Sequence, residues 1–375
     1  MQLNVQMMSI LDRFSGRPAL ADRRPIPKSN SDRERMGVEL LSRYNVLTYG
    51  ELRRRVEAVS VQLCKQAGRG SLRSGDRAAL LGYPGIDFTT VDFACNLIGI
   101  TTVPLQTSGS MTQHLAILEE TTPRLLVVSV DLLDRVDDII SHISTIERIL
   151  ILDYRGGESG HREALQKSIH SARITPEPLN LDSILEWEPN RVDDDHLAML
   201  LYTSGSTGEP KGAMYSARLV GEMWGGEGWS EFFAEKAHVA SFHYMPMSHV
   251  AGHSSVRSTL SRGGITYFAS TTNLSNFFED LALARPTELS LVPRVCELLH
   301  QEYQRRVGSH DGDDTNVRQI LDDMRVSVLG GRVEWASCTS APVSAELKAF
   351  MELLLGIELH ELYGTTEIGG VLADG

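Results

Sequence analysis

A run of small and hydroxyl-bearing residues directly after an apolar stretch is the part of the chain best suited to chemistry. The apolar stretch covers residues 197–202, and the run after it ends at Lys211 and Gly212. Glycines let a backbone approach a ligand closely, while hydroxyl groups, N–H groups and a lysine attract an anion. These donors predict a site for a polyphosphate. The residues expected to hold the phosphates, with Lys211 beside them, are Thr203, Ser204, Gly205, Ser206, Thr207 and Gly208.

The same run differs from the two common nucleotide-binding fingerprints. A Walker A loop ends in Gly-Lys-Ser/Thr, whereas here Pro210 precedes Lys211 and Gly212 follows it. The GxGxxG pattern of dinucleotide-binding proteins does not occur. A phosphotransferase of the P-loop class therefore loses support. A flexible Ser/Gly linker is also disfavoured, because a linker would not follow a strong apolar stretch or end in Pro-Lys.

Short apolar runs alternate with helical patterns through much of the chain. Thr48 and Glu51 have the spacing of a capping box, which predicts that a helix begins at Thr48. Strands are expected at 78–81, 102–105, 125–128, 149–152 and 197–202, and helices at 48–67, 93–98, 115–118 and 136–146. This alternation predicts an α/β fold with parallel sheets covered by helices. Residues 1–46 and 155–195 are polar and contain prolines, so we expect an irregular lead-in and a surface connection there.

The loop at 202–212 resembles the phosphate-loop signature of the adenylate-forming superfamily, which includes acyl-CoA synthetases, peptide-synthetase adenylation domains and luciferases. Residues 244–252 (YMPMSHVAG) resemble its substrate-site motif, and residues 363–367 (YGTTE) resemble its YGxTE motif. Residues 340–342 are similar to its adenine-side loop. Within the superfamily, residues 17–375 are most similar to the adenylation domain of carboxylic acid reductases, in phrases such as VPLQTS, KGAMY, PMSHV and SAPVSAELKAF.

This resemblance implies that ATP activates a fatty or aromatic carboxylic acid to acyl-AMP, with release of pyrophosphate. Two anions meet in such a reaction, so the site has to neutralise charge and fix their geometry. The resemblance assigns the substrate carboxylate to His249, the α-phosphate to Thr366 and Mg²⁺ to Glu367, whose carboxylate suits a hard cation. Lys211 completes this catalytic set. The expected adenine-side residues are Ser340, Ala341, Pro342, Tyr363, Gly364 and Thr365, with Tyr363 stacked on the base.

The resemblance also implies the N-terminal region of the acetyl-CoA synthetase-like fold, with two mixed or parallel sheets flanked by helices. After the lead-in at 1–46, we assign residues 47–375 to the AMP-binding domain. One subdomain takes about 77–230, and the other takes about 47–76 and 231–375. We expect the small β subdomain and the lysine-bearing C-terminal lid to be missing, together with the carrier and reductase domains that use phosphopantetheine and NADPH. We therefore expect weak ATP binding and little or no adenylation by this chain alone.

Two other functions stay open. A fatty acyl-CoA ligase would share all three motifs. A remnant could bind nucleotide without turning it over, and an acyl-hydroxamate assay beside calorimetry with MgATP would separate that case from catalysis.

Charge and cysteine content exclude several classes. The 36 Lys and Arg residues are outnumbered by 49 Asp and Glu residues, and the net charge of -13 disfavours nucleic acid as a partner. The four cysteines are far apart and form no CxxC pair, which indicates reduced thiols in a cytoplasmic protein. We identify no signal peptide and no apolar run long enough to span a bilayer.

Overall fold

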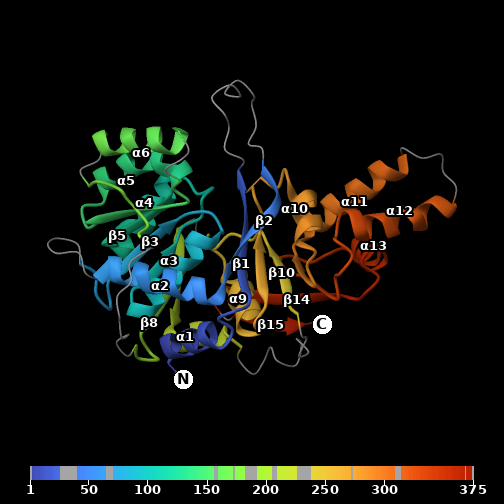
Figure 1. Cartoon of the computed structure of the whole chain (residues 1–375), viewed down its shortest axis with the longest axis horizontal. Coiled ribbons are helices and arrows are strands. Elements are labelled where there is room, and N and C mark those ends of the chain that lie inside the picture. Colours follow the sequence, from blue (N-terminus) through green and yellow to red (C-terminus); the bar gives the residue numbers. More distant parts are fainter. Residues whose placement is uncertain are drawn as a thin grey trace.

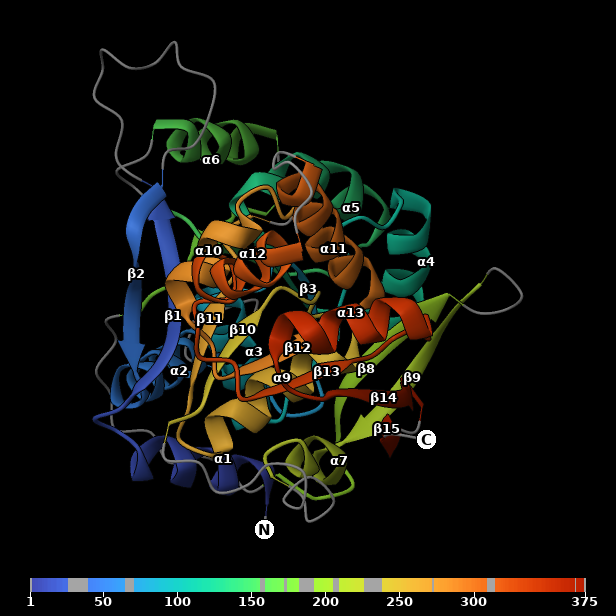
Figure 2. The same cartoon turned by 90° about the vertical axis from the view of Figure 1, so that its right-hand side faces the viewer.

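Two sheets form the frame of the computed structural model. It describes residues 2–25, 40–64, 71–155, 159–171, 174–181, 192–204, 209–225, 238–271, 273–308, 314–367 and 369–373. Figure 1 shows the two sheets side by side with helices between and outside them, and Figure 2 shows the same arrangement from the side.

The first sheet has seven strands in the order β7-β6-β5-β3-β4-β8-β9. Its strands are β3 (Arg77–Leu81), β4 (Thr101–Pro104), β5 (Leu125–Ser129), β6 (Arg148–Leu152), β7 (Glu177–Pro178), β8 (Leu197–Ser204) and β9 (Pro210–Ser216). All neighbours are parallel except β8 and β9, which form an antiparallel hairpin. The predicted alternation of strands and helices is confirmed in this sheet.

The second sheet has eight strands in the order β15-β14-β13-β12-β10-β11-β1-β2. Its strands are β1 (Pro18–Pro25), β2 (Leu40–Thr48), β10 (Ala240–His243), β11 (Ile265–Phe268), β12 (Glu288–Leu291), β13 (Trp335–Cys338), β14 (Leu359–Thr365) and β15 (Gly369–Ala373). Antiparallel pairs lie at the two ends, β1 with β2 and β14 with β15, and the inner strands are parallel.

Helices complete a five-layer α/β arrangement. The middle layer contains α1 (Leu3–Arg13), α2 (Tyr49–Cys64), α3 (Ile86–Ile98), α7 (Ala217–Glu222) and α9 (Val250–Ser261). The outer layer of the first sheet contains α4 (Met111–Thr121), the 3-10 helix η1 (Val130–Arg135), α5 (Val136–His142) and α6 (Ser159–Ser171). The outer layer of the second sheet contains α10 (Phe277–Ala284), α11 (Pro293–Gly308), α12 (Asp314–Ser327) and α13 (Ala345–Leu355).

Alternate side chains of a strand explain how the first sheet packs against helices on both of its faces. In β3, Ala78 and Leu80 join the core of the middle layer, whereas Ala79 and Leu81 join the core under α4 and α5. Successive side chains of a strand point to opposite faces, so a strand buried on both sides is apolar throughout. The predicted capping box is confirmed, because Thr48 N donates to Glu51 Oε2 at 2.8 Å and Glu51 N donates to Thr48 Oγ1 at 3.2 Å.

The expectation of an irregular lead-in over residues 1–46 is wrong. Leu3, Met7 and Leu11 recur every four residues, which places them on one face of α1, and all three are buried in the middle layer. Strands β1 and β2 then pair with each other, and β1 also pairs with β11. The arginines of this segment concealed its apolar positions, and α1 and β1 contribute buried residues to the core.

Residues 155–195 also contain more structure than the expected surface connection. Helix α6 lies over the outer face of the first sheet, where Ala164 and Leu165 pack against the core. Strand β7 then adds to β6 at the edge. Pro178 is compatible with an edge strand, because its missing N–H is not needed there.

Truncating a buried residue of α1 tests the corrected role of the N-terminal segment. We expect Leu11→Ala to lower the free energy of unfolding by about 2–5 kcal/mol, the usual cost of removing a buried leucine side chain. Urea denaturation followed by circular dichroism measures this. The matched control is Val5→Ala on the same helix, where Val5 is 48% exposed, with an expected change within about 0.5 kcal/mol. Equal small effects of both changes would contradict the assignment.

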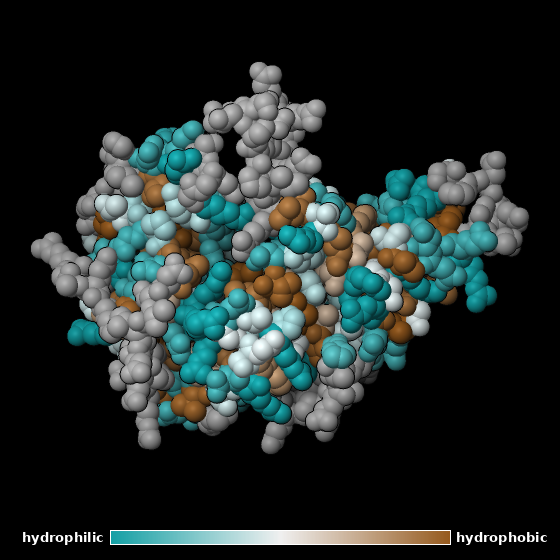
Figure 3. All heavy atoms as spheres, in the orientation of Figure 1, coloured by the Kyte–Doolittle hydropathy of each residue, from teal (hydrophilic) through white to brown (hydrophobic). Residues whose placement is uncertain are grey.

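The surface shows no broad apolar face in the view of Figure 3, where brown side chains lie in small groups between hydrophilic ones. Among the helices in the described ranges, none combines the length and apolar character that crossing a bilayer requires.

Candidate functional site

The predicted phosphate loop connects β8 to β9, which pair as an antiparallel hairpin. Thr203 pairs with Lys211 and Tyr202 pairs with Gly212 across the two strands, and Lys211 is exposed. A Cβ atom on Gly212 would lie 2.9 Å from Cζ of Tyr202, so a side chain at this position would displace the tyrosine ring. Four of the predicted phosphate-binding residues, Gly205, Ser206, Thr207 and Gly208, lie outside the described residues. The described strands fix where the loop starts and ends.

The YGTTE segment forms the end of β14 and the turn that leads to β15. Gly364 pairs with Gly370 and Thr365 pairs with Gly369, which places Thr366 and Glu367 in the turn. Glu367 is exposed. Within the described residues, the buried Oγ1 of Thr365 has no hydrogen-bond partner. The turn therefore presents a carboxylate and backbone groups to solvent.

Tyr215 on β9 joins the phosphate hairpin to this turn. Its hydroxyl donates a hydrogen bond to the carbonyl oxygen of Thr366. Burial, together with the nearby negative charge of Glu367, raises the pKa of Tyr215 to about 12. The structure thus brings the hairpin of the first sheet and the turn of the second sheet together.

The remaining predicted residues lie along one edge of the second sheet. Strands β10, β12, β13 and β14 are parallel, so the segments that follow them meet at their carboxyl ends. Ser340, Ala341 and Pro342 form the exposed loop between β13 and α13, and Ser340 adopts a φ of 78°. Ligands of open α/β sheets bind at this edge. Because β14 and β10 are three strand spacings apart, the segments after them are separated by roughly 15 Å.

His249 lies on the loop after β10 and is the N-cap residue of α9. The first turn of the helix packs closely on this loop, because a Cβ on Gly252 would lie 2.5 Å from the carbonyl oxygen of Pro246. Glycine at 252 thus lets α9 begin directly behind the loop. The imidazole of His249 is exposed at the surface, yet the surrounding protein atoms desolvate it and lower its pKa. A neutral imidazole at pH 7 can hydrogen-bond a carboxylate without carrying a charge.

His243 lies at the end of β10, next to the same loop, and sets the acid stability of this region. Burial, with a smaller contribution from His253, lowers the pKa of His243 to about 4. A histidine with a lowered folded-state pKa contributes full stability above its ordinary pKa and loses it as the pH falls. We therefore expect the free energy of unfolding to fall by up to about 1.4 kcal/mol per pH unit between pH 6.5 and 4.

Urea denaturation at pH 7, 6 and 5 checks this acid sensitivity. His243→Gln should flatten the pH dependence, whereas the matched change at the exposed His142, His142→Gln, should leave it unchanged. An equally steep fall in the His243→Gln chain would contradict the assignment.

A metal ion at this site would be coordinated partly by the protein and partly by the nucleotide. Within the described residues, no group of three His, Cys, Asp or Glu side chains is arranged to hold an ion. Mg²⁺ is commonly held by one or two carboxylates together with substrate phosphates and water. The exposed carboxylate of Glu367, next to the phosphate hairpin, fits that mode of binding and does not fit a resident metal centre.

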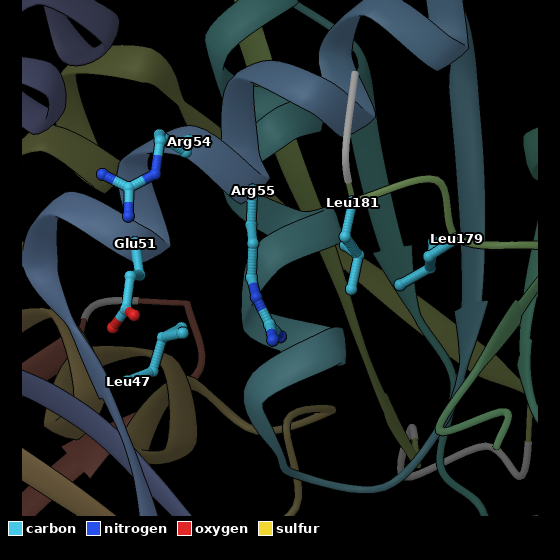
Figure 4. A pocket seen from close by; sticks show the side chains of 6 residues that line it. All are labelled: Leu47, Glu51, Arg54, Arg55, Leu179 and Leu181. Carbon is cyan, nitrogen blue, oxygen red and sulfur yellow. The ribbon is translucent and has the colours of Figure 1, made fainter. Parts of the chain in front are cut away.

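A cavity of about 340 Å³ lies away from these segments, at the exposed side of α2. Figure 4 shows the residues that line it, which are Leu47, Glu51, Arg54, Arg55, Leu179 and Leu181. The carboxylate of Glu51 already caps α2 through Thr48, and Arg55 lies 3.6 Å from Asp87. None of the predicted site residues lines this cavity, so it is not part of the candidate site.

Removing the Tyr215 hydroxyl tests the junction between the two segments. We expect Tyr215→Phe to weaken AMP binding about two- to tenfold, because one hydrogen bond contributes about 0.5–1.5 kcal/mol. Calorimetric titration measures the affinity. Tyr49→Phe is the control, since the Tyr49 hydroxyl donates to Leu260 O and Gly264 O in the core; its affinity for AMP should match that of the unchanged chain. Unchanged affinity in Tyr215→Phe would contradict a role for the junction.

Sequence reasoning missed Tyr215. The residue lies in the short strand that follows the phosphate loop, and its partner Thr366 is 151 positions away. Recognising residues 210–216 as the second strand of a hairpin would have drawn attention to it, because every other side chain of that strand points to the same face.

Three comparisons place this arrangement among known proteins. A family model described as AMP-binding enzyme matches residues 26–374. The chain is similar to a carboxylic acid reductase from Segniliparus rugosus, with 37% identity over 100% of the chain and 33% of that protein. A carboxylic acid reductase from Mycobacterium tuberculosis is 39% identical over 98% of the chain and 32% of that protein. The chain therefore spans about a third of the length of these curated relatives.

A solved structure supports the fold directly. It is the A domain of the carboxylic acid reductase from Segniliparus rugosus, in complex with AMP and a co-purified carboxylic acid. It matches 100% of the chain and 62% of its own length, with a TM-score of 0.91 and 35% identity. The predicted α/β fold with two mixed sheets flanked by helices is confirmed.

Proposed function

Because the chain belongs to the AMP-binding enzyme family, we propose that it provides the adenylation part of a carboxylic acid reductase. In this function ATP activates a fatty or aromatic acid to acyl-AMP. The contact between Tyr215 and Thr366 carries the proposal, because it joins the phosphate hairpin to the turn that bears Glu367. The carboxylic acid reductase domain solved with AMP and an acid supports the same ligands for this chain.

The reaction joins two anions. A carboxylate oxygen attacks the α-phosphorus of ATP, the bond from that phosphorus to the bridging oxygen breaks, and pyrophosphate leaves with the electron pair. Donors must offset the charge of the phosphates and hold the attacking oxygen opposite the leaving group. In the proposed site the β8–β9 loop and Lys211 supply donors to the β- and γ-phosphates, and Thr366 supplies one to the α-phosphate.

The edge of the second sheet holds the carboxylic acid substrate and the adenine of ATP. His249 orients the substrate carboxylate with a neutral imidazole. Ser340, Ala341, Pro342 and the segment from Tyr363 to Thr365 form the adenine side, and the ring of Tyr363, 61% exposed, is available to stack on the base. Glu367 is the residue that would hold Mg²⁺, which would offset the charge of the phosphates.

The relatives favour a reductase over a free-standing ligase as the parent protein. We place the carrier domain with phosphopantetheine and the NADPH-dependent reductase in other parts of that protein. The acyl-AMP would pass to a thiol of the carrier, with AMP as the second product. No disulfide forms among the four cysteines, all of which lie in the described residues, and this agrees with a cytoplasmic location.

Calorimetry tests the proposal. AMP should bind the chain with measurable heat, and octanoate or benzoate should bind more tightly when AMP is present. Trapping with hydroxylamine in the presence of MgATP and the acid then separates a catalytic chain from a remnant that only binds nucleotide. A chain that binds neither AMP nor MgATP would contradict the proposed function.

A further inference from the structure

A fully buried group of charged and polar side chains joins the two halves of the molecule. Asp92 and Asn96 lie on α3, which covers the first sheet, and His253 and Arg257 lie on α9, which covers the second. Arg257 Nη2 donates to Asp92 Oδ2 at 2.6 Å and to Asn96 Oδ1 at 3.3 Å. Arg257 also lies over the ring of Phe93 at 5.2 Å.

The protonation states of this group follow from its hydrogen bonds. Arg257 Nη1 lies 2.8 Å from His253 Nδ1. A guanidinium can only donate, so His253 Nδ1 accepts and the imidazole is neutral. Burial acts against the charged form of Asp92, but the charge and hydrogen bond of the adjacent Arg257 guanidinium outweigh it and hold the pKa of that carboxyl well below its usual range. Asp92 and Arg257 therefore form an ion pair away from water.

Stability alone does not account for this pair. Among the residues that the structure describes, Asp92 Oδ1, Asn96 Nδ2 and Arg257 Nε are buried without a hydrogen-bond partner. An incompletely satisfied buried network is less favourable than apolar packing of the same volume. Apolar side chains of both helices, such as Val91 and Val256, already join the same core. A directional contact adds a specific alignment, which apolar packing does not supply.

The alignment matters because of where α9 begins. His249 is its N-cap, and Arg257 follows eight residues later, about 12 Å along the axis. Helix α9 therefore links His249, at its N-terminus, rigidly to Arg257 of the ion pair. On the opposite side, α3 packs against the sheet that carries the phosphate hairpin.

We propose that Asp92 and Arg257 are positioning residues, which hold His249 in register with the phosphate hairpin through α9. This inference rests on the proposed function, because the register concerns the distance between the acid and the α-phosphate. The two residues contact neither ligand. Their loss should displace the carboxylate site and leave the adenine side, which belongs to β13 and β14, in place.

Ligand affinities in substituted full chains test the proposal. In Asp92→Asn and in Arg257→Lys, we expect the Kd of octanoate, measured by calorimetry with AMP present, to rise about five- to tenfold. The Kd of AMP should stay within about twofold. A purely structural role would lower the unfolding midpoint in urea and leave both Kd values of the folded chain unchanged.

The matched control is Asp280→Asn, which breaks the other fully buried Arg–Asp pair of the described chain. Arg23 Nη1 and Asp280 Oδ1 are 2.7 Å apart and lie between β1 and α10, away from α9. This control should lose stability but keep the octanoate Kd. If Asp92→Asn does not fold, Arg257→Lys still gives the result, because it keeps the charge and loses only the fork-shaped geometry.

The outcomes separate the two proposals. If the unsubstituted chain binds AMP and octanoate, and Asp92→Asn and Arg257→Lys bind octanoate as tightly as it does, the positioning role alone is overturned. An equal rise of the octanoate Kd in Asp280→Asn overturns it too, because the effect would then be general. An unchanged chain that binds no AMP overturns the proposed function, and the positioning role with it.

Discussion

Glu367→Gln should weaken the binding of MgATP by about 10- to 100-fold and leave the affinity for AMP within about twofold. The amide keeps the shape and the neighbours of the carboxylate but supplies no charge for a cation held between protein and phosphates. AMP lacks the β- and γ-phosphates that would share that cation. Calorimetric titrations with MgATP, with ATP and a chelator, and with AMP separate the contribution of the metal to the affinity from that of the adenine.

The matched control for this change lies on the strand that leads into the turn. Glu361 is six residues earlier on β14, and one of its carboxylate oxygens lies 3.0 Å from Lys348 Nζ. Glu361→Gln removes a charge of the same sign from the strand before the turn, and it should leave both affinities unchanged. Equal loss of MgATP affinity in the two variants, or no loss in Glu367→Gln, would contradict the assignment of the metal to the turn.

Arg257→Met should lower the free energy of unfolding by about 3–5 kcal/mol, because it leaves the Asp92 carboxylate buried without its partner charge. Replacing both residues at once, in Asp92→Leu with Arg257→Met, removes the buried charges and should restore most of that loss. Urea denaturation of the two single variants and the double variant measures the coupling between the two side chains.

Breaking an exposed ion pair should cost much less stability than breaking the buried pair of Asp92 and Arg257. Arg294 and Glu297 are 3.1 Å apart with side chains that are 69% and 50% exposed, and Arg294→Met should cost less than about 1 kcal/mol. A double variant as unstable as Arg257→Met would contradict the account of the buried pair. If the double variant is stable and still binds octanoate weakly, stability and positioning are separated in one chain.

Much of the fold could be predicted because apolar runs and turn residues are local signals. The strand at 125–128 and the capping box at Thr48 depend only on neighbouring residues, and both are present. The N-terminal strands could not be predicted in this way, because β1 is stabilised by β11, which is more than 240 residues away. The arginines of β1 and β2 concealed the few residues that reach the core.

In the candidate site, too, the features set by neighbouring residues could be predicted and the contacts between distant residues could not. The motifs at Thr203, His249 and Glu367 stand out in the sequence because their residue types suit phosphates, carboxylates and Mg²⁺. The contacts that align these motifs do not, since Tyr215 and Thr366, or Asp92 and Arg257, meet only after both sheets have formed. Residues that act through another residue have no local pattern to reveal them.

A crystal structure of the chain with AMP tests the central claim most directly. The phosphate should lie between the β8–β9 hairpin and the turn at Thr366 and Glu367, with the adenine beside Tyr363 and the loop at 340–342. AMP bound in the cavity near Arg54 and Arg55, or at any position that contacts neither the hairpin nor the turn, would contradict it.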